Sequence, residues 1–317
     1  MSCLPFFAEF DGAMLERWAQ AIGPDWHNYH IASLLSVLLI SSICGLVGAL
    51  VVGNRMAFFS DAMAHCAFAG ISLGLIIAIY MLGFTTRSDE LQWFLPLVMA
   101  LFGAAVGVGI AFVRENTGLA SDTVIGVFFA AAIGFGAMIL QAFPTGRSFD
   151  PERFLFGGPN FVQPLDLVIL AILLVVTALI LVWRYNRFVL ASFNPSLARS
   201  RGVSVALDSY VFIVLLALIV NFSISAVGVL LINALLVVPA ATASNVSSSM
   251  RQMFRWTLYV SLGSGLVGLY LSRRLNFTIN GEPRQFGVSG TIICVGVLGF
   301  ALSMGLAYLG RRFRRLG

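Results

Sequence analysis

An aspartate and a histidine, Asp61 and His65, lie four residues apart inside a long apolar run, and no other pair in this sequence is better suited to chemistry. On an α-helix this spacing places both side chains on one face. An ionisable residue costs about 2.5–3.5 kcal/mol near the centre of a lipid-facing helix, so the pair should face protein or water and is a candidate functional site. The structural alternative is an aspartate that caps the helix at the membrane boundary and a histidine that is hydrogen-bonded inside the bundle.

The functional interpretation of the pair is metal binding. A carboxylate and an imidazole together suit zinc, manganese or iron(II), whereas copper(I) prefers thiolates. Two ligands do not complete a four-coordinate shell, but a twofold homodimer whose two copies of this helix met on the axis would supply two of each. Small residues at Ala62, Cys66, Gly70 and Gly74 would allow that approach, and packing within one chain is their alternative explanation. Asn233 is a further candidate, as an oxygen ligand or, the role we favour, as a hydrogen-bonding group between helices.

The composition defines the setting of these residues. The chain has 317 residues, of which 59% are hydrophobic and 10% are charged, and its mean hydropathy is +0.94. Soluble domains average about 45–50% apolar and about 25% charged residues, so this is an integral membrane protein. The apolar residues form long uncharged runs, which indicate helices and not the alternating pattern of barrel strands. The predicted fold is an all-α, polytopic transmembrane bundle.

About 20 apolar residues make one crossing, and on that basis we predict about nine spans. The sixth, seventh and eighth are short. The sixth and seventh meet at 221–225 and would alternatively form one broken hairpin, which leaves eight full spans and a re-entrant piece. The nine candidates are Ile31–Val52, Ser60–Leu82, Leu91–Val113, Ser121–Ala142, Pro164–Trp183, Ser209–Phe222, Ala226–Ala243, Thr257–Leu271 and Gly287–Leu309.

The positions of the arginines predict the orientation in the membrane. The arginines between the fifth and sixth spans and those in the C-terminal tail should be cytoplasmic, which places the N-terminus outside. This topology puts twelve of the 19 basic residues inside and seven outside. Residues 1–30 then form an extracytoplasmic segment, with apolar side chains at helical spacing that suggest a helix lying on the membrane. Residues 31–317 form one transmembrane domain, and the outer loop Phe143–Gln163 is long enough to form a short surface helix or a docking ledge.

Two further segments have predicted mechanical roles. On the inner side, Asn194 can cap a short helix whose first turn contains Pro195, and Gly202 can end it. Such a helix, projecting into the cytoplasm, is a surface on which a partner can push. In the seventh span Pro239 removes a backbone donor, so we expect it to kink or terminate that helix and to be a possible hinge.

Five sequence segments, in order, resemble the permease subunits of bacterial ABC importers for zinc, manganese and related divalent metals. The resemblance extends from about Gly45 to Leu309. The segments are Arg55-Met-Ala-Phe-Phe-Ser-Asp-Ala-Met-Ala-His65, Ser121-Asp-Thr-Val-Ile-Gly-Val127, Phe154-Leu-Phe-Gly157, Asn194-Pro-Ser-Leu-Ala-Arg-Ser-Arg-Gly-Val203 and Val229-Leu-Leu-Ile-Asn-Ala-Leu-Leu-Val-Val-Pro-Ala-Ala-Thr-Ala243.

The resemblance implies a homodimer in the bacterial inner membrane, a cytoplasmic ATPase dimer and an extracytoplasmic metal-binding protein. It also implies that the 194–202 segment is the coupling helix that fits a groove on the ATPase. Two departures from the family pattern stand out: Asn194 replaces a frequent acidic residue, and Phe128-Phe-Ala-Ala-Ala132 occupies the stretch in which some zinc-specific members carry a histidine. The second departure leaves manganese or iron open as the cargo. The residues assigned to coupling are Asn194, Pro195, Ser196, Leu197, Ala198, Arg199 and Gly202.

The sequence also excludes several functions. It contains no lysine, so a phosphate-binding loop that ends in Gly-Lys-Ser/Thr is absent, and ATP hydrolysis must belong to another subunit. Its arginines lie in short loops between helices, where membrane topology explains them better than nucleic-acid binding does. We expect no permanent cofactor and no enzymatic activity. The alternatives to a metal-ion permease are a permease for a metal chelate, such as a siderophore or cobalamin, an ion-coupled secondary transporter, and an intramembrane metalloenzyme that uses Asp61 and His65.

Overall fold

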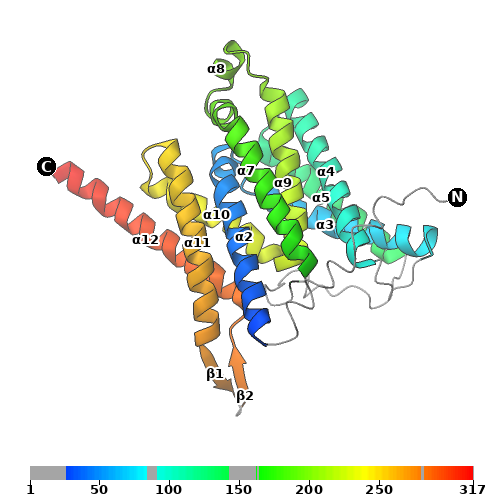
Figure 1. Cartoon of the computed structure of the whole chain (residues 1–317). Coiled ribbons are helices and arrows are strands. Elements are labelled where there is room, and N and C mark those ends of the chain that lie inside the picture. The colour runs from blue at the N-terminus through cyan, green and yellow to red at the C-terminus, as the bar shows by residue number, and fades with distance from the viewer. Residues whose placement is uncertain (1–25, 84–90, 143–161, 163, 280–281, 317) are drawn as a thin grey trace.

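The computed structural model describes residues 26–83, 91–142, 162, 164–279 and 282–316. In these residues the chain forms a bundle of long helices, with one short helix at one end and a two-stranded hairpin at the other (Figure 1). The elements are α2 (Trp26–Gly53), α3 (Phe59–Ile76), the π-helix η1 (Ile77–Met81), α4 (Leu91–Thr117), α5 (Ser121–Ala142), α7 (Pro164–Phe193), α8 (Pro195–Ser200), α9 (Val205–Val227), α10 (Val229–Val246), α11 (Met250–Arg274), β1 (Asn276–Ile279), β2 (Glu282–Gln285) and α12 (Val288–Leu316).

Eight helical segments in the described residues are long and apolar enough to cross a membrane, which confirms the predicted polytopic bundle. The remaining long helix, α11, has 25 residues, but serine, glycine and arginine interrupt its apolar run. Most helices extend past the predicted spans. The largest extension is in α7, which continues ten residues beyond Trp183 to Phe193 because arginine and asparagine end an apolar run without ending a helix. Residues 1–25, where the surface helix is expected, and nearly all of Phe143–Gln163 lie outside the described residues.

The sixth and seventh spans are separated at a different residue from the predicted one. Helix α9 runs through 221–225 without interruption and ends at Val227, and α10 begins at Val229. The single residue between them, Gly228, has φ 86° and ψ 163°, a conformation that is essentially restricted to glycine. The predicted break at 221–225 is therefore wrong, because an asparagine in an apolar helix is tolerated when its side chain bonds back to the helix. Asn221 does so, donating to the backbone oxygen of Ala217 at 2.7 Å.

Helices α2, α3, α9 and α10 contribute much of the buried core. Helix α2 packs against α7, α10 and α11, while α3 packs against α4 and α5. Helix α9 lies between α4 and α7, and α10 also contacts α11 and α12. The C-terminal part of α12 leaves the bundle, as Figure 1 shows. Helices α3 and α10, which carry the candidate site, thus each pack against several other helices.

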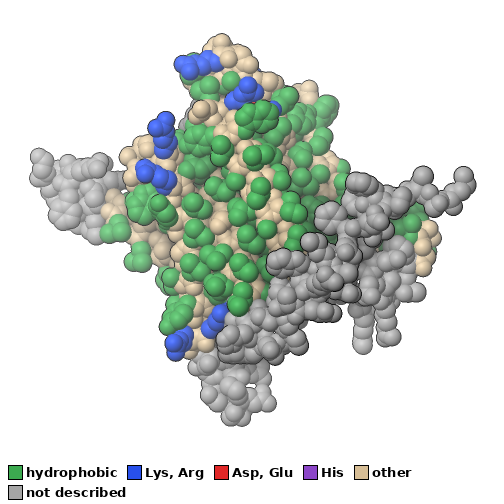
Figure 2. Space-filling view, in the orientation of Figure 1, with side chains coloured by type: hydrophobic (Ala, Val, Ile, Leu, Met, Phe, Trp, Pro, Cys, Tyr) green, Lys and Arg blue, Asp and Glu red, His purple; other side chains and the backbone are tan. Residues whose placement is uncertain are grey.

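The surface has the pattern expected of a membrane protein. Figure 2 shows hydrophobic side chains covering the middle of the visible face, with arginines near the α8 end and the opposite end. Helix α7 illustrates the apolar band, with large exposed side chains that include Ile172, Leu179 and Val182. Because exposure of so much apolar surface to water would be unfavourable, this band is the lipid-facing surface.

A β-hairpin joins α11 to α12 and is an addition to the all-helical prediction. Strand β1 pairs antiparallel with β2, from Asn276 opposite Gln285 to Ile279 opposite Glu282. The sequence between the strands is Asn280-Gly281, a dipeptide that strongly favours two-residue hairpin turns. The Asn280-Gly281 dipeptide would have allowed the hairpin to be predicted from the sequence. The hairpin lies at the end of the molecule opposite α8 (Figure 1).

A glycine permits close contact between α4 and α9. Gly103 of α4 lies against the side-chain amide of Asn221, which is fully buried. A Cβ atom at this position would overlap with the amide, so the contact depends on glycine.

Gly103→Ala should therefore destabilise the protein by about 1–3 kcal/mol, the usual cost of overpacking a core. Thermal unfolding in detergent measures the effect. Gly126→Ala is the matched control, because a Cβ added to this α5 glycine meets no atom within 4 Å. Adding Asn221→Ala to Gly103→Ala should recover part of the loss. Equal unfolding temperatures for Gly103→Ala and the wild type would contradict the steric explanation.

Candidate metal site

The chain enters α3 through a tight reversal at the end of α2. The backbone N–H of Met56 donates to the oxygen of Val51 at 3.0 Å, and that of Arg55 donates to Val52 at 3.1 Å. These two bonds define a Schellman motif, with Arg55 in the left-handed position at φ 55° where glycine is usual. The reversal fixes the point at which α3 begins, and hence the place of Asp61.

Asp61 lies in the first turn of α3 and is half-buried. The capping position is occupied by Phe58, which makes no side-chain capping bond. The alternative in which Asp61 caps the helix is therefore wrong. A carboxylate in the first turn is nevertheless favoured by the helix dipole, and its oxygens remain available to groups on neighbouring helices.

Asn233 of α10 is the partner of this carboxylate. Its side-chain Nδ2 donates a hydrogen bond to Asp61 Oδ1 at 3.2 Å, joining residues 172 positions apart in the chain. The predicted hydrogen bond between helices is therefore present. The amide oxygen of Asn233 is buried and has no hydrogen-bond partner. A buried, unpaired carbonyl oxygen is costly and needs an explanation.

His65 lies one turn after Asp61 and is also half-buried. Its ring stands edge-on to the ring of Phe129 of α5, with 4.7 Å between centroids and 86° between planes. Within the described part of the chain its ring nitrogens accept and donate no hydrogen bond, so the expected alternative of a hydrogen-bonded histidine finds no support. Phe129 is a neighbour of the site that sequence reasoning missed, because an aromatic residue in an apolar span carries no distinguishing signal.

The site in one chain offers a carboxylate, an imidazole and an amide oxygen. Among the described residues no group of three or more His, Cys, Asp and Glu side chains gathers where it would hold a metal ion. Asp61, His65 and Asn233 thus make an incomplete donor set, which suits a site that must release an ion more than one that must retain it.

The small residues of α3 face the interior of the same chain. Ala62, Cys66, Gly70 and Gly74 are all buried. A Cβ added to Gly70 would lie 3.0 Å from Met99 Cα, so this stripe packs closely on α4. The alternative of packing within one chain is therefore correct, and a second copy would have to meet this one through a different surface.

The predicted inner helix is present as α8. Asn194 is its N-cap, with the side-chain oxygen accepting from Leu197 N at 3.0 Å, and Pro195 occupies the first turn. Gly202, at φ 72°, closes the helix with its N–H donating to Arg199 O at 3.0 Å. Of the six helical residues only Ala198 is buried. Ser196, Leu197 and Arg199 are exposed, as a docking surface requires.

Pro239 lies within α10 and does not end it, because the helix continues to Val246. The expectation of termination is wrong. The proline is buried beside a cavity of about 10 Å³, which is lined by residues of α10, α11 and α12. Apolar packing on several sides holds the helix together across the missing hydrogen bond.

Comparisons with known proteins agree with this architecture. Residues 27–283 match the family described as ABC 3 transport family. The manganese import system permease protein ScaB of Streptococcus gordonii is 26% identical over 266 residues, which cover 83% of this chain and 88% of ScaB. The high-affinity zinc uptake system membrane protein ZnuB of Buchnera aphidicola is 27% identical over 246 residues, covering 78% of this chain and 89% of ZnuB. A chain of PsaBC from Streptococcus pneumoniae, solved in complex with Fab, shares the fold with a TM-score of 0.67 at 22% identity, over 92% of this chain and 95% of that one.

Proposed function

Because this chain belongs to the ABC 3 transport family, we propose that it passes a divalent transition metal into the cytoplasm through the site at Asp61 and His65. The chain is a multi-pass membrane permease subunit of an ABC transporter. It is not itself an enzyme, and ATP hydrolysis belongs to a separate subunit. The absence of lysine from the sequence agrees with this division of labour.

The observation that carries the proposal is the contact between α3 and α10. Asp61 and Asn233 meet at 3.2 Å, and the amide oxygen of Asn233 is buried without a partner. Half a turn of the amide about its terminal bond would present that oxygen, in place of the nitrogen, to an ion held by Asp61. A cation would satisfy the oxygen and the carboxylate together. A permease for a bulky chelate gives no reason for this arrangement.

The donor set favours manganese over zinc and leaves iron(II) possible. Carboxylate and carbonyl oxygens suit manganese, whereas zinc sites are richer in imidazole and thiolate. Two of the three candidate donors are oxygens, and the 128–132 stretch of α5 places a phenylalanine ring against His65 where another imidazole would increase zinc affinity. The relatives that transport manganese and zinc are consistent with either cargo.

We further propose the partners and orientation that this role requires. Residues 31–317 act as one permease domain of a homodimer in the bacterial inner membrane, with the N-terminus outside and the C-terminus in the cytoplasm. An ATPase dimer engages α8, through Asn194, Pro195, Ser196, Leu197, Ala198, Arg199 and Gly202. An extracytoplasmic metal-binding protein delivers the ion at the end that carries the β-hairpin, opposite α8.

Alternating access would separate the donors of α3 from the donor of α10. Gly228, the single residue between α9 and α10, is the natural pivot, because its conformation leaves α10 free to point away from α9. Pro239 is a second proposed hinge, further along α10. A small rotation of α10 changes the distance between Asp61 and Asn233, and with it the affinity for the ion.

Metal uptake into proteoliposomes tests the proposal. The permease, reconstituted with its ATPase and binding protein, should accumulate radioactive manganese only when ATP is present. Omission of the ATPase should abolish uptake, whereas a secondary transporter would continue to work on an ion gradient alone. Uptake of a siderophore or cobalamin, with no uptake of free manganese or zinc, would overturn the proposal.

Variants of Asn233 test the amide oxygen directly. Asn233→Leu should lower the apparent affinity for manganese by about tenfold or more, because a ligand is lost at a buried position. Asn233→Asp keeps an oxygen donor at the same place and should retain transport. Both are measured as the manganese concentration at half-maximal uptake. If Asn233→Leu transported with unchanged affinity, the residue would be only a link between helices.

A further inference from the structure

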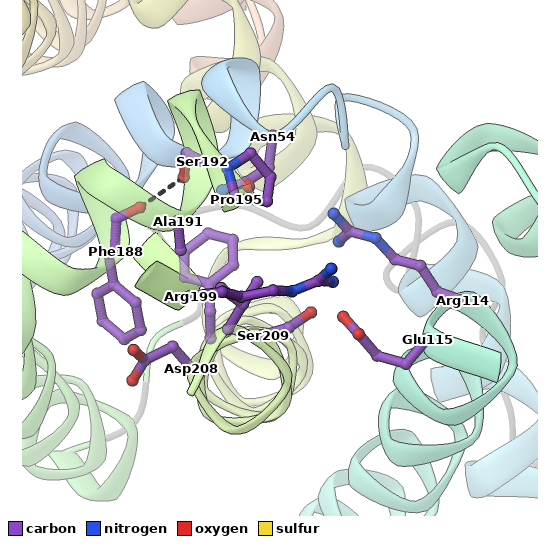
Figure 3. A pocket seen from close by; sticks show the side chains of 12 residues that line it. Asn54, Arg114, Glu115, Phe188, Ala191, Ser192, Pro195, Arg199, Asp208 and Ser209 are labelled. Atoms are coloured by element: carbon purple, nitrogen blue, oxygen red, sulfur yellow. Dashed lines mark hydrogen bonds between the residues drawn. The ribbon is translucent and has the colours of Figure 1, made fainter. Parts of the chain in front are cut away.

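A cavity of about 150 Å³ is lined in part by α8, and the proposed transport site does not use it. Figure 3 shows residues from five parts of the chain around it: Pro195 and Arg199 of α8, Arg114 and Glu115 at the end of α4, Asp208 and Ser209 at the start of α9, Phe188, Ala191 and Ser192 near the end of α7, and Asn54 in the turn between α2 and α3. We refer to it as the α8 cavity. It has room for several water molecules.

The α8 cavity lies where a rigid element has space to move. Protein interiors are close-packed, so a helix shifts readily only toward empty or water-filled volume. Helix α8 is held to the bundle by little apolar surface, since Ala198 is its sole buried residue. Both of its ends are closed by caps, at Asn194 and at Gly202. It is therefore able to move as one unit.

Opposite charges face each other across this space. In Figure 3 the guanidinium of Arg199 points across the α8 cavity toward the carboxylate of Glu115, and the side chain of Arg114 lies on the far wall. Arg199 and Glu115 do not form an ion pair in this structure, whereas Arg184 and Asp208 beside the cavity do, at 2.5 Å. The attraction between Arg199 and Glu115 would strengthen if α8 moved inward and displaced the water between them.

The far wall is connected to the start of α3. Arg114 Nη1 donates to the sulfur of Met56 at 3.5 Å. Met56 is fully buried, and its backbone oxygen accepts from Phe59 N at 3.0 Å in the first turn of α3. Asp61 follows two residues later. The wall that faces Arg199 thus contacts the turn that positions the transport site.

We propose that Arg199 and Glu115 are a conformational latch, open here and closed as an ion pair when the ATPase pushes α8 into the α8 cavity. Closure pulls the end of α4 toward α8. Through the contact between Arg114 and Met56 it also pulls the beginning of α3. The latch rests on the proposed function, for which it supplies the path from nucleotide binding to the metal site. Glu115 and Arg199 act as positioning residues and do not contact the ion.

Charge reversal tests the latch through its effect on coupling. Arg199→Glu and Glu115→Arg should each lower the number of metal ions moved per ATP by about tenfold, within the range common for coupling between sites. The double exchange restores opposite charges and should recover coupling to within about threefold of wild type. Arg201→Glu is the control, an exposed arginine two residues from Arg199 that does not line the cavity. A double exchange no better than the single changes would overturn the latch.

Cross-linking tests the movement without reference to the cargo. Arg199→Cys and Glu115→Cys are introduced together after Cys3, Cys44, Cys66 and Cys294 have been replaced by serine. A short thiol cross-linker should join the new cysteines several-fold more often in the ATP-trapped complex than in the nucleotide-free one. Equal yields would overturn the latch. Nucleotide-dependent cross-linking in a complex that imports no metal would instead sink the proposed function and leave the latch in place.

Discussion

Asp61→Asn and His65→Ala should each abolish ATP-dependent metal uptake while the permease still folds and binds its ATPase. Mutation of a residue that only hydrogen-bonds to a metal ligand typically lowers metal affinity or activity by about 10–100-fold. Loss of a direct ligand should cost at least as much. Asp61→Asn is the sharper variant, because it keeps the shape of the side chain and removes only its charge. Manganese uptake by proteoliposomes, together with co-purification of the ATPase, measures both effects.

The matched control is Asp122→Asn. Asp122 also lies in the first turn of an apolar helix, α5, but it is exposed to the surroundings. The same chemical change there should leave uptake near the wild-type level. Normal transport by both Asp61→Asn and His65→Ala would show that the pair is structural.

Asp208→Ala should lower the free energy of unfolding by about 3–5 kcal/mol, the usual cost of leaving a buried charge without its partner. Asp208 is only 2% exposed, and its Oδ1 accepts from Arg184 Nη1 at 2.5 Å, which ties α9 to α7 just beside α8. The other carboxylate oxygen has no partner. Arg184 is 18% exposed and would remain largely enclosed without a counter-charge. Thermal or denaturant unfolding in detergent measures the loss.

A double replacement separates the net contribution of the ion pair to stability from the cost of leaving one of its charges unpaired. Arg184→Met with Asp208→Leu removes both charges and should be much closer to wild type in stability than Asp208→Ala, because apolar residues often replace buried ion pairs at little cost. If Asp208→Ala unfolded at the same temperature as the wild type, water would have to screen the ion pair. The link between α7 and α9 through Arg184 and Asp208 would then not contribute to stability.

The architecture could be predicted from the sequence because apolar length is a strong signal in membranes. Ser121–Ala142 was predicted to the residue, and α8 was predicted from its capping residues. The ends of the other helices were less accurate, since a helix continues into polar sequence for as long as its backbone remains paired. The break at Gly228 was missed because Asn221 and its neighbouring serines gave a more conspicuous, but misleading, polar signal.

At the site, the spacing of Asp61 and His65 was visible in the sequence, and a hydrogen bond from Asn233 was the favoured role of that residue. Its partner, Asp61, could not be chosen beforehand, because 172 residues separate the two and only the packing of α10 brings them together. The stripe from Ala62 to Gly74 was ambiguous for a related reason. Small residues indicate that some helix approaches closely without showing whether it belongs to the same chain.

The length of α7 has a consequence for the membranes in which this permease can work. Its 30 residues span about 45 Å at 1.5 Å per residue, against a hydrocarbon thickness of about 30 Å. The surplus length would place α8 beyond the hydrocarbon layer, where a soluble ATPase can reach it. Thickening the bilayer with long-chain lipids would shorten that stalk or increase its tilt. The coupling between ATP hydrolysis and metal transport should then weaken in bilayers in which both the permease and the ATPase remain folded.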